Sequence, residues 1–277
     1  MYEQIFLLGS SQLAKKCLTV LKQQTPRHIP VTYLDTDTHK KAELMQLLAE
    51  ITAPALIFSI MNPYIFTAGV TARPNLTIVN LHHGILPGHR GRNAQAWAIF
   101  YEEEEAGITW HLVDEGVDTG QILHIERIPI HENDTALSLM KKQNLLVPES
   151  LNLLLPQLLS GEIQAGNQKA AKPARDYFHL NRDIPGGGIL DPGWSGRKIS
   201  CFLRAMDFGI LKVLGTPVLR WKGGMWEFSS YQIKKAEDNY EPLIIQNGND
   251  ICIKKDSFQI TLRKVRQQLE KKERIES

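Results

Sequence analysis

Residues 80–120 read NLHHGILPGHRGRNAQAWAIFYEEEEAGITWHLVDEGVDTG, and the fold can be worked out from this stretch. The apolar run 76–81 leads into it and predicts a buried strand. Asn80 and His82 are two residues apart at the end of that strand, so they point to the same side. A second strand-like run, GITWHLV, leads into a turn rich in Asp and Gly that contains Asp118. Because open α/β sheets gather their sites at strand ends, we expect all three side chains to lie near one site.

The three side chains are a carboxamide, an imidazole and a carboxylate, a set that suits transfer of an acyl group to an amine. The pKa of imidazole is ordinarily about 6.5, and a nearby carboxylate would raise it and select one tautomer of His82. The Asn80 amide can donate to an oxygen that becomes negative, a contribution of roughly 3 kcal/mol in other enzymes. An activated acyl donor removes the need for a nucleophile on the protein. Spacing alone does not separate this chemistry from a structural role for the same residues.

The sequence pattern of the whole stretch resembles that of the folate-dependent formyltransferases. That family combines Asn-x-His, a Leu-Pro-x-x-x-Gly loop and a later Asp-x-Gly turn. The chain contains every part of the pattern: Asn80 with His82, Leu86-Pro87 with Gly91, and Asp118 with Gly120. The resemblance implies transfer of a formyl group from the co-substrate 10-formyltetrahydrofolate to an amine. It also implies that Asn80 stabilises the oxyanion, that His82 is the general acid and base, and that Asp118 raises the pKa of His82.

The resemblance implies binding residues for both substrates as well. The loop arginines Arg90 and Arg92 can form charge-assisted bonds to the carboxylates of a folate tail or to phosphate. Residues expected to bind the folate are Leu86, Arg92, Asp114, Glu115, Gly116 and Val117. Residues expected to bind the amine substrate are Tyr64, Ile65, Phe66, Arg90 and Tyr177.

The first half of the chain predicts repeated strand–helix units. Apolar runs at 4–8, 30–34 and 55–60 read as buried strands, and stretches with helical spacing follow the first two. Alternation of this kind predicts an α/β fold with a Rossmann-like, mainly parallel sheet. Only Gly9 follows the first strand, where the dinucleotide fingerprint needs three glycines, so we expect no dinucleotide cofactor.

A change in composition between residues 160 and 188 marks a domain boundary. This part of the sequence is rich in glycine and proline, as linkers are. We therefore expect a formyltransferase catalytic domain at 1–187 and a second domain at 188–277. Short alternating runs in the second domain predict a small β-barrel, which resembles the oligonucleotide-binding-fold-like (OB-like) C-terminal domain of some family members.

Composition narrows the class of protein. The chain has 277 residues, 43% of them hydrophobic, and a net charge of +2, so it can build a sizeable core and shows no general preference for polyanions. Its three cysteines lack Cys-x-x-Cys spacing, which predicts neither a disulfide framework nor a metal site. Without a basic segment followed by an apolar one at its start, and without about 18 consecutive apolar residues, the chain is expected to be cytoplasmic and to have no membrane contact.

Several acceptors for the formyl group stay open at this point. The Arg-Gly-Arg loop resembles the amino-sugar enzymes, so the preferred acceptor is the amine of a nucleotide-linked amino sugar. The alternative is an amino acid carried by tRNA or by a carrier protein, which would provide the second domain with a macromolecular partner. A second alternative is a non-catalytic binding module of the same fold. A homodimer is also left open.

Overall fold

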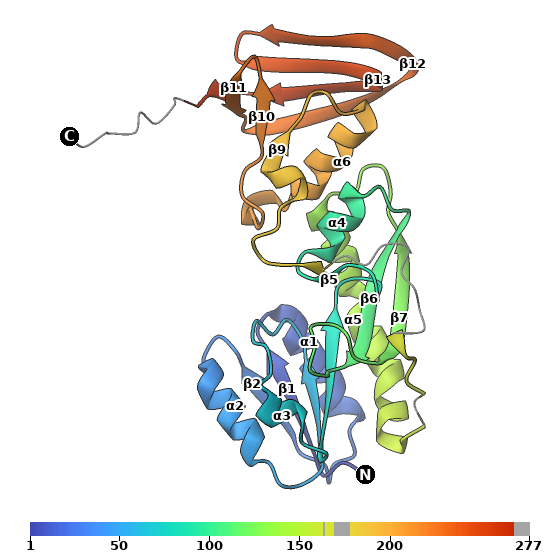
Figure 1. The fold of residues 1–277 in the computed structure, drawn as a ribbon. Helices are drawn as coiled ribbons and strands as arrows, with labels where there is room; N and C mark the ends of the chain where they lie inside the picture. Colours follow the sequence, from blue (N-terminus) through green and yellow to red (C-terminus); the bar gives the residue numbers. More distant parts are fainter. Residues whose placement is uncertain (163, 169–177, 269–277) are drawn as a thin grey trace, which may run out of the picture. The chain divides into compact units, whose positions relative to one another are not determined.

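The structure is a computed structural model that describes residues 1–162, 164–168 and 178–268 (Figure 1). The chain forms two compact units, and each takes up several separate stretches of sequence. Unit 1 comprises Met1–Ala94, Glu105–Pro129 and Leu139–Asn181. Unit 2 comprises Gln95–Glu104, Ile130–Ser138 and Arg182–Ser277.

Unit 1 is built on one central sheet. The strands of the unit are β1 (Gln4–Gly9), β2 (Val31–Asp35), β3 (Ala55–Ser59), β4 (Leu76–His82), β5 (Arg90–Gly91), β6 (Glu105–Leu112), β7 (Ile122–Pro129) and β8 (Phe178–His179). Of these, β5 and β8 form a separate two-stranded sheet. Its helices are α1 (Gln12–Gln24), α2 (Lys41–Glu50) and α3 (Ala68–Thr71), while α4 (Ala94–Phe100) and α5 (Ala136–Ser160) have residues in both units. The central sheet has the order β2-β1-β3-β4-β6-β7. Its pairs from β2 to β4 are parallel, and β6 and β7 are added antiparallel.

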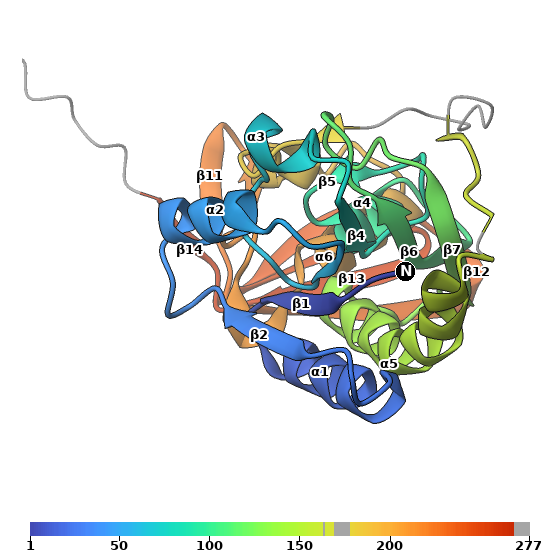
Figure 2. The same cartoon turned by 90° about the horizontal axis from the view of Figure 1, so that it is seen from below.

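The inner strands β1 and β3 of the central sheet are buried on both faces, as their continuous apolar runs predict. Ile5 and Leu7 of β1 belong to an apolar cluster with residues of α1 and α5. The alternate residues Phe6 and Leu8 belong to a second cluster with residues of α2 and α3. Figure 2 shows α1 and α5 together on one side of the sheet. The predicted mixed α/β fold with a mainly parallel sheet is therefore confirmed.

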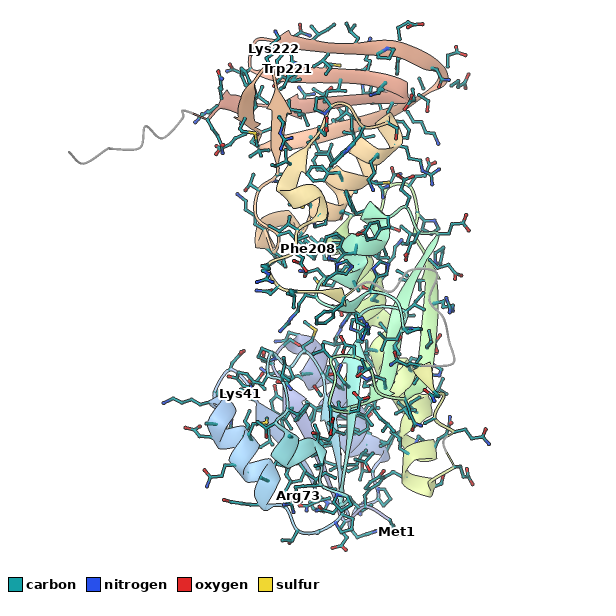
Figure 3. The ribbon with its side chains drawn as sticks, viewed as in Figure 1. Met1, Lys41, Arg73, Phe208, Trp221 and Lys222 are labelled. Atoms are coloured by element: carbon teal, nitrogen blue, oxygen red, sulfur yellow. The ribbon has the colours of Figure 1, made fainter. Side chains whose placement is uncertain are left out.

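The segment before β4 is fixed by two side chains that form hydrogen bonds with carbonyls at the end of α2. Arg73, labelled in Figure 3, donates to the carbonyls of Ala49 and Ile51. Asn75 also donates to the Ile51 carbonyl, at 2.9 Å. These bonds satisfy carbonyls that a helix end leaves without an intrahelical partner. They also support the start of β4, whose far end carries Asn80.

Unit 2 combines helices with two separate sheets. Its elements are the 3₁₀ helices η2 (Pro185–Gly188) and η3 (Gly209–Leu211), helix α6 (Gly196–Met206), and strands β9 (Ile189–Leu190), β10 (Val218–Trp221), β11 (Gly224–Glu227), β12 (Ser230–Asn247), β13 (Asp250–Arg263) and β14 (Arg266–Gln267). One sheet has the order β14-β11-β10-β9, and the other is the long hairpin of β12 and β13. Helix α6 packs on β13. No described helix is both long and apolar enough to cross a membrane.

The predicted OB-like closure of the second domain is not confirmed, because the described strands form two sheets and no closed barrel. Strand β12 runs through the acidic segment near residue 238 without a break. Register shifts between Lys235 and Tyr240, and between Tyr240 and Leu243, absorb the extra residues as bulges. A long hairpin therefore replaces several of the short strands that the sequence predicts.

Candidate active site

The end of β4 places two of the predicted site residues side by side. In the antiparallel pairing with β6, Asn80 lies opposite His111 and His82 lies opposite Thr109. Asn80 is half-buried, whereas His82 is only 6% exposed. Because the two residues are separated by one position in the strand, both side chains lie on the same face.

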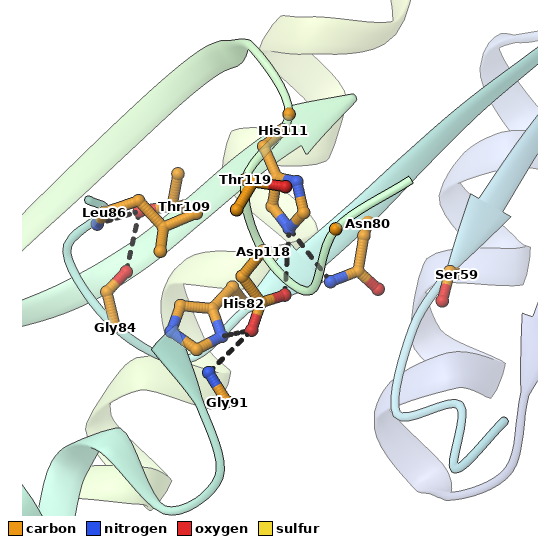
Figure 4. A network of polar contacts seen from close by, with 12 residues as sticks. Ser59, Asn80, His82, Gly84, Leu86, Gly91, Thr109, His111, Asp118 and Thr119 are labelled. Atoms are coloured by element: carbon orange, nitrogen blue, oxygen red, sulfur yellow. Dashed lines mark hydrogen bonds and ion pairs between the residues drawn. The ribbon is translucent and has the colours of Figure 1, made fainter. Parts of the chain in front are cut away.

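Asp118 reaches this pair from the turn between β6 and β7 (Figure 4). Its Oδ2 lies 3.4 Å from His82 Nδ1 and accepts a hydrogen bond from the Gly91 amide at 2.8 Å. The Asp118 backbone has a φ of 54°, a left-handed conformation that Asp tolerates better than most residues. Gln168 donates its side-chain amide to the Asp118 carbonyl at 3.2 Å and so holds the turn from the other side.

His111 is a further member of this group that the sequence reasoning did not single out. Its Nε2 lies 3.1 Å from Asn80 Nδ2 and 3.3 Å from Asp118 Oδ1. Its Nδ1 bonds to the Leu112 carbonyl at 2.7 Å. A signal was present, because His111 is a titratable residue inside an apolar strand that leads directly to Asp118. The antiparallel pairing of β6 with β4, which brings His111 opposite Asn80, could not be read from that signal.

Burial and charge act on the pKa of His82 in opposite directions. Burial lowers the pKa, the Asp118 carboxylate raises it, and the net result is a lowered pKa. The Asp118 carboxylate thus acts on this pKa in the expected direction, but burial outweighs it. For Asp118, burial raises the pKa, but the His82 and His111 rings and the Gly91 amide outweigh it and hold the pKa well below its usual range. At neutral pH the site therefore contains an ionised carboxylate beside a neutral imidazole.

The second nitrogen of His82 has a partner of its own. His82 Nε2 lies 2.9 Å from the carbonyl of His89, in the loop that follows β4. A carbonyl only accepts, so Nε2 carries the proton in this arrangement. The His82 ring therefore lies between two acceptors, the His89 carbonyl and the Asp118 carboxylate. It can reach a substrate through Nε2 only when the bond to His89 is exchanged.

Thr109 ties the loop after β4 to β6. Its hydroxyl accepts a hydrogen bond from the Leu86 amide at 3.2 Å and donates one to the Gly84 carbonyl at 2.6 Å (Figure 4). Thr109 itself is fully buried. The same loop carries Gly91, whose amide bonds to Asp118. Thr109 thus fixes the beginning of the segment that supports Asp118.

We expect Thr109→Val to lower the free energy of unfolding by about 1–3 kcal/mol, because the buried Leu86 amide and Gly84 carbonyl both lose a partner. Thr109→Ser keeps the hydroxyl and is the matched control. Urea unfolding, followed by far-ultraviolet circular dichroism, measures the difference. Equal transition midpoints for the two variants would show that the hydroxyl does not stabilise this loop.

The residues expected to bind folate lie in two settings. Leu86 is 2% exposed, so its side chain is part of the core. The segment Asp114–Val117 is exposed, and Asp114 Oδ1 accepts from the Gly116 amide at 3.1 Å and from the Thr119 hydroxyl at 2.6 Å. These bonds shape the turn and leave its backbone on the surface beside Asp118. Arg92 is also exposed.

The residues expected to bind the amine substrate are only partly brought together. The Tyr64 hydroxyl donates to the carbonyls of Thr36 and His39, both at 3.2 Å, and its ring packs on the core. Ile65 is 64% exposed, whereas Phe66 packs on the same core as Tyr64. The remaining placements are these: Arg92 Nη2 lies 3.5 Å from the Pro63 carbonyl, Arg90 lies 5.9 Å from the Phe178 ring centre, and Tyr177 lies outside the described residues.

The α/β sheet brings a carboxamide, an imidazole and a carboxylate close together at its strand ends. Residues 8–152, just over half of the chain, match the family described as formyl transferase. The chain belongs to the formyl transferase family.

Two curated proteins are similar in sequence to this chain. The chain is 40% identical over 145 residues to GDP-perosamine N-formyltransferase of Brucella melitensis, covering 50% of this chain and 52% of that protein. It is 29% identical over 231 residues to the bifunctional polymyxin resistance protein ArnA of Wigglesworthia glossinidia brevipalpis, covering 82% of this chain and 34% of that protein. The chain thus spans about half the length of the first of these curated relatives, and less of the second.

A solved structure shares the fold over nearly the whole chain. It is an N-formyltransferase from Helicobacter canadensis in complex with folinic acid and dTDP-3-aminofucose. The TM-score is 0.73 at 17% sequence identity, and the alignment covers 95% of this chain and 100% of the other. At this identity the similarity shows the fold alone.

Proposed function

We propose that this protein transfers a formyl group from 10-formyltetrahydrofolate to the primary amine of a nucleotide-linked amino sugar. The observation that carries the proposal is the convergence of Asn80, His82 and Asp118 at one end of the sheet, with distances of 3.1–3.4 Å along the chain of contacts through His111. The names of the relatives support the substrate class. One relative is a GDP-perosamine N-formyltransferase, and the Helicobacter structure holds folinic acid and dTDP-3-aminofucose.

In the proposed reaction, each residue acts on one atom at the reacting centre. The second N–H of the Asn80 amide donates to the formyl oxygen, which becomes negative as the amine nitrogen bonds to the formyl carbon. For this step the ring proton of neutral His82 lies on Nδ1, which faces Asp118, and Nε2 leaves the His89 carbonyl. Nε2 then takes the proton released by the amine and returns it to N10 of the folate as the N10–carbon bond breaks. Asp118 stabilises the imidazolium formed in between. These steps need no metal and no nucleophile on the protein.

The acceptor is assigned by the chemistry around the site. Arg90 lies in β5 and Arg92 follows it directly, and guanidinium groups form paired bonds to phosphate or carboxylate. The exposed backbone of the 114–117 turn, next to Asp118, offers peptide groups to the edge of a flat ring. We therefore assign the turn to the folate and the arginine-bearing loop to the anionic parts of both substrates. Tyr177 stays a prediction.

Turnover with a panel of amines tests the proposal. The protein is incubated with 10-formyltetrahydrofolate and with GDP- or dTDP-linked amino sugars, charged initiator tRNA, or free amino acids, and tetrahydrofolate release is followed by absorbance. Release that depends on a nucleotide-linked amino sugar is the expected result. Release only with charged tRNA or a carrier-bound amino acid would favour the alternative acceptor. Release without any amine would indicate hydrolysis of the donor, and no release would favour the non-catalytic module.

We expect Asn80→Ala to lower kcat by roughly 10²–10³-fold, the loss that follows removal of one donor to a developing oxyanion. Binding of the donor should change little, because this bond forms fully only as charge develops. Stopped-flow turnover and fluorescence titration with 5-formyltetrahydrofolate measure the two quantities separately. Asn239→Ala, at an exposed position of β12, is the control for loss of an asparagine. Loss of donor binding with unchanged kcat would instead make Asn80 a binding residue.

The macromolecular alternative depends on unit 2. Its aromatic side chains include Trp221, whose ring is covered by Lys222 Nζ at 4.3 Å (Figure 3). Trp226 donates its indole N–H to the Trp221 carbonyl at 3.0 Å, so this pair is also used within the protein. A small-molecule acceptor is therefore the preferred assignment. The domain division at residues 187 and 188, the homodimer and the cytoplasmic location stay predictions.

A further inference from the structure

His111 is a buried titratable side chain with no part in the reaction proposed above. It is 2% exposed, and it contacts the two predicted catalytic residues that do not touch each other. Its Nε2 lies 3.1 Å from Asn80 Nδ2 and 3.3 Å from Asp118 Oδ1 (Figure 4). One nitrogen atom therefore faces both a donor and an acceptor.

The other ring nitrogen decides which tautomer His111 adopts. Nδ1 lies 2.7 Å from the Leu112 carbonyl, which can only accept, so Nδ1 carries a proton. A neutral His111 then has a lone pair on Nε2 and accepts a hydrogen bond from Asn80. A cationic His111 has a proton on Nε2, so it donates to Asp118 and can no longer accept from Asn80. The two hydrogen bonds of Nε2 exclude each other.

We propose that neutral His111 is a positioning residue that holds the Asn80 amide in its catalytic orientation, and that protonation of His111 releases that amide. The proposal rests on the proposed function of the same site. With one N–H of Asn80 bound to His111, the second N–H is held at a fixed angle for the formyl oxygen. When His111 turns to Asp118, the amide loses its fixed orientation, and the oxyanion loses a prepared donor.

The titratable groups around His111 are the catalytic residues themselves. The charged groups in contact are Asp118, at 3.3 Å, and through it His82, whose Nδ1 lies 3.4 Å from the same carboxylate. Asp118 thus lies between two imidazole rings, and a positive charge on one ring opposes a charge on the other. During turnover the proton belongs on His82. When the proton is on His111, the Asp118 carboxylate is still ionised, but the Asn80 amide is no longer held in its catalytic orientation.

Two substitutions of His111 test the roles of its two ring nitrogens separately. His111→Gln places an amide oxygen near the position of Nε2, where it accepts from Asn80 at every pH. His111→Asn places a donor near the position of Nδ1, where it keeps the bond to Leu112 and leaves Asn80 without a partner. We expect His111→Gln to retain kcat within about threefold of the wild type and His111→Asn to lose roughly 10–100-fold, with unchanged KM for the donor. His124→Gln and His124→Asn, on β7 and outside the site, are the matched controls.

The comparison of these two variants provides a readout that a purely structural ring would not move. Equal losses of kcat in His111→Gln and His111→Asn would overturn the proposal.

A measurement without substrate keeps this proposal separate from the proposed function. The side-chain amide of Asn80 is followed by ¹⁵N NMR during a pH titration, with its signal assigned from Asn80→Ala and the His111 ring signals from His111→Gln. We expect the Asn80 amide shifts to follow the titration of the His111 ring in the wild type and to be independent of that titration in His111→Gln. Amide shifts that ignore the His111 titration would refute the positioning role even in a fully active enzyme. Coupled shifts in a protein that transfers no formyl group would refute only the proposed function.

Discussion

His82→Gln is expected to lower kcat by roughly 10²–10⁴-fold, the usual contribution of a general acid and base. The amide nitrogen of glutamine lies near the position of the imidazole Nε2, so the bond to the His89 carbonyl, 2.9 Å in the wild type, can be kept. What is lost is a group that can take up a proton. The effect should therefore fall on turnover and leave the fold and the binding of the donor nearly unchanged.

Rapid-quench measurement of formyl transfer, together with a thermal unfolding curve, tests this expectation. His124→Gln is the control, because its imidazole pairs with Glu126 at 2.8 Å on β7 and contacts none of the site residues. A His82→Gln protein with wild-type kcat would show that proton transfer uses another group, such as Asp118. A protein with lost turnover and a strongly lowered melting temperature would instead indicate a structural role for the ring.

Asp118→Asn should have an effect of similar size, up to about 10⁴-fold on kcat, as the same change has beside the catalytic histidine of serine proteases. The amide oxygen can still accept from Gly91, which bonds to Asp118 at 2.8 Å, so the turn should be kept. The negative charge between the two imidazole rings disappears. An imidazolium at His82 then loses the one stabilising charge that offsets its burial.

The sign of the accompanying pH shift follows from the causes of the His82 pKa. Burial is the largest cause that lowers that pKa, and the Asp118 charge is the largest cause that raises it, so removing the charge lowers the pKa further. The acid limb of the residual kcat should therefore move to lower pH in Asp118→Asn. Asp118→Glu keeps the charge and serves as the control for side-chain chemistry. An acid limb that moves to higher pH in Asp118→Asn would contradict the assignment of the carboxylate.

Much of unit 1 was predictable because its strands and its polar residues follow simple periodic rules. The apolar runs that contain Ile5 and Phe58 form buried strands of a mainly parallel sheet. The i and i+2 spacing of Asn80 and His82 puts both on one face, where Asp118 meets His82 at 3.4 Å. These relations depend only on the pleat of a strand and on the position of turns.

Other features depend on contacts between strands and could not be read from one segment. His111 gains its importance from lying opposite Asn80 in an antiparallel pair that sequence periodicity does not specify. The net pKa of His82 depends on how completely the folded chain covers the ring. Leu86 and Tyr64, expected to touch ligands, use their side chains in packing or hydrogen bonds within the protein. The long β12 strand passes through a polar stretch by bulging, which local turn signals do not reveal.

The interleaving of the two units along the chain has a consequence for gene exchange between relatives. Unit 2 draws on Gln95–Glu104 and Ile130–Ser138 as well as on the residues from Arg182 onward. Within it, Arg204 donates to the Asp134 carbonyl at 2.8 Å, and the Lys198 ammonium lies 3.5 Å from the Phe100 ring centre. A single crossover near codon 182 would join the later stretch of one parent to the earlier stretches of another and mismatch these partners. A functional chimera therefore requires three coordinated replacements, so the three stretches of unit 2 are expected to diverge together.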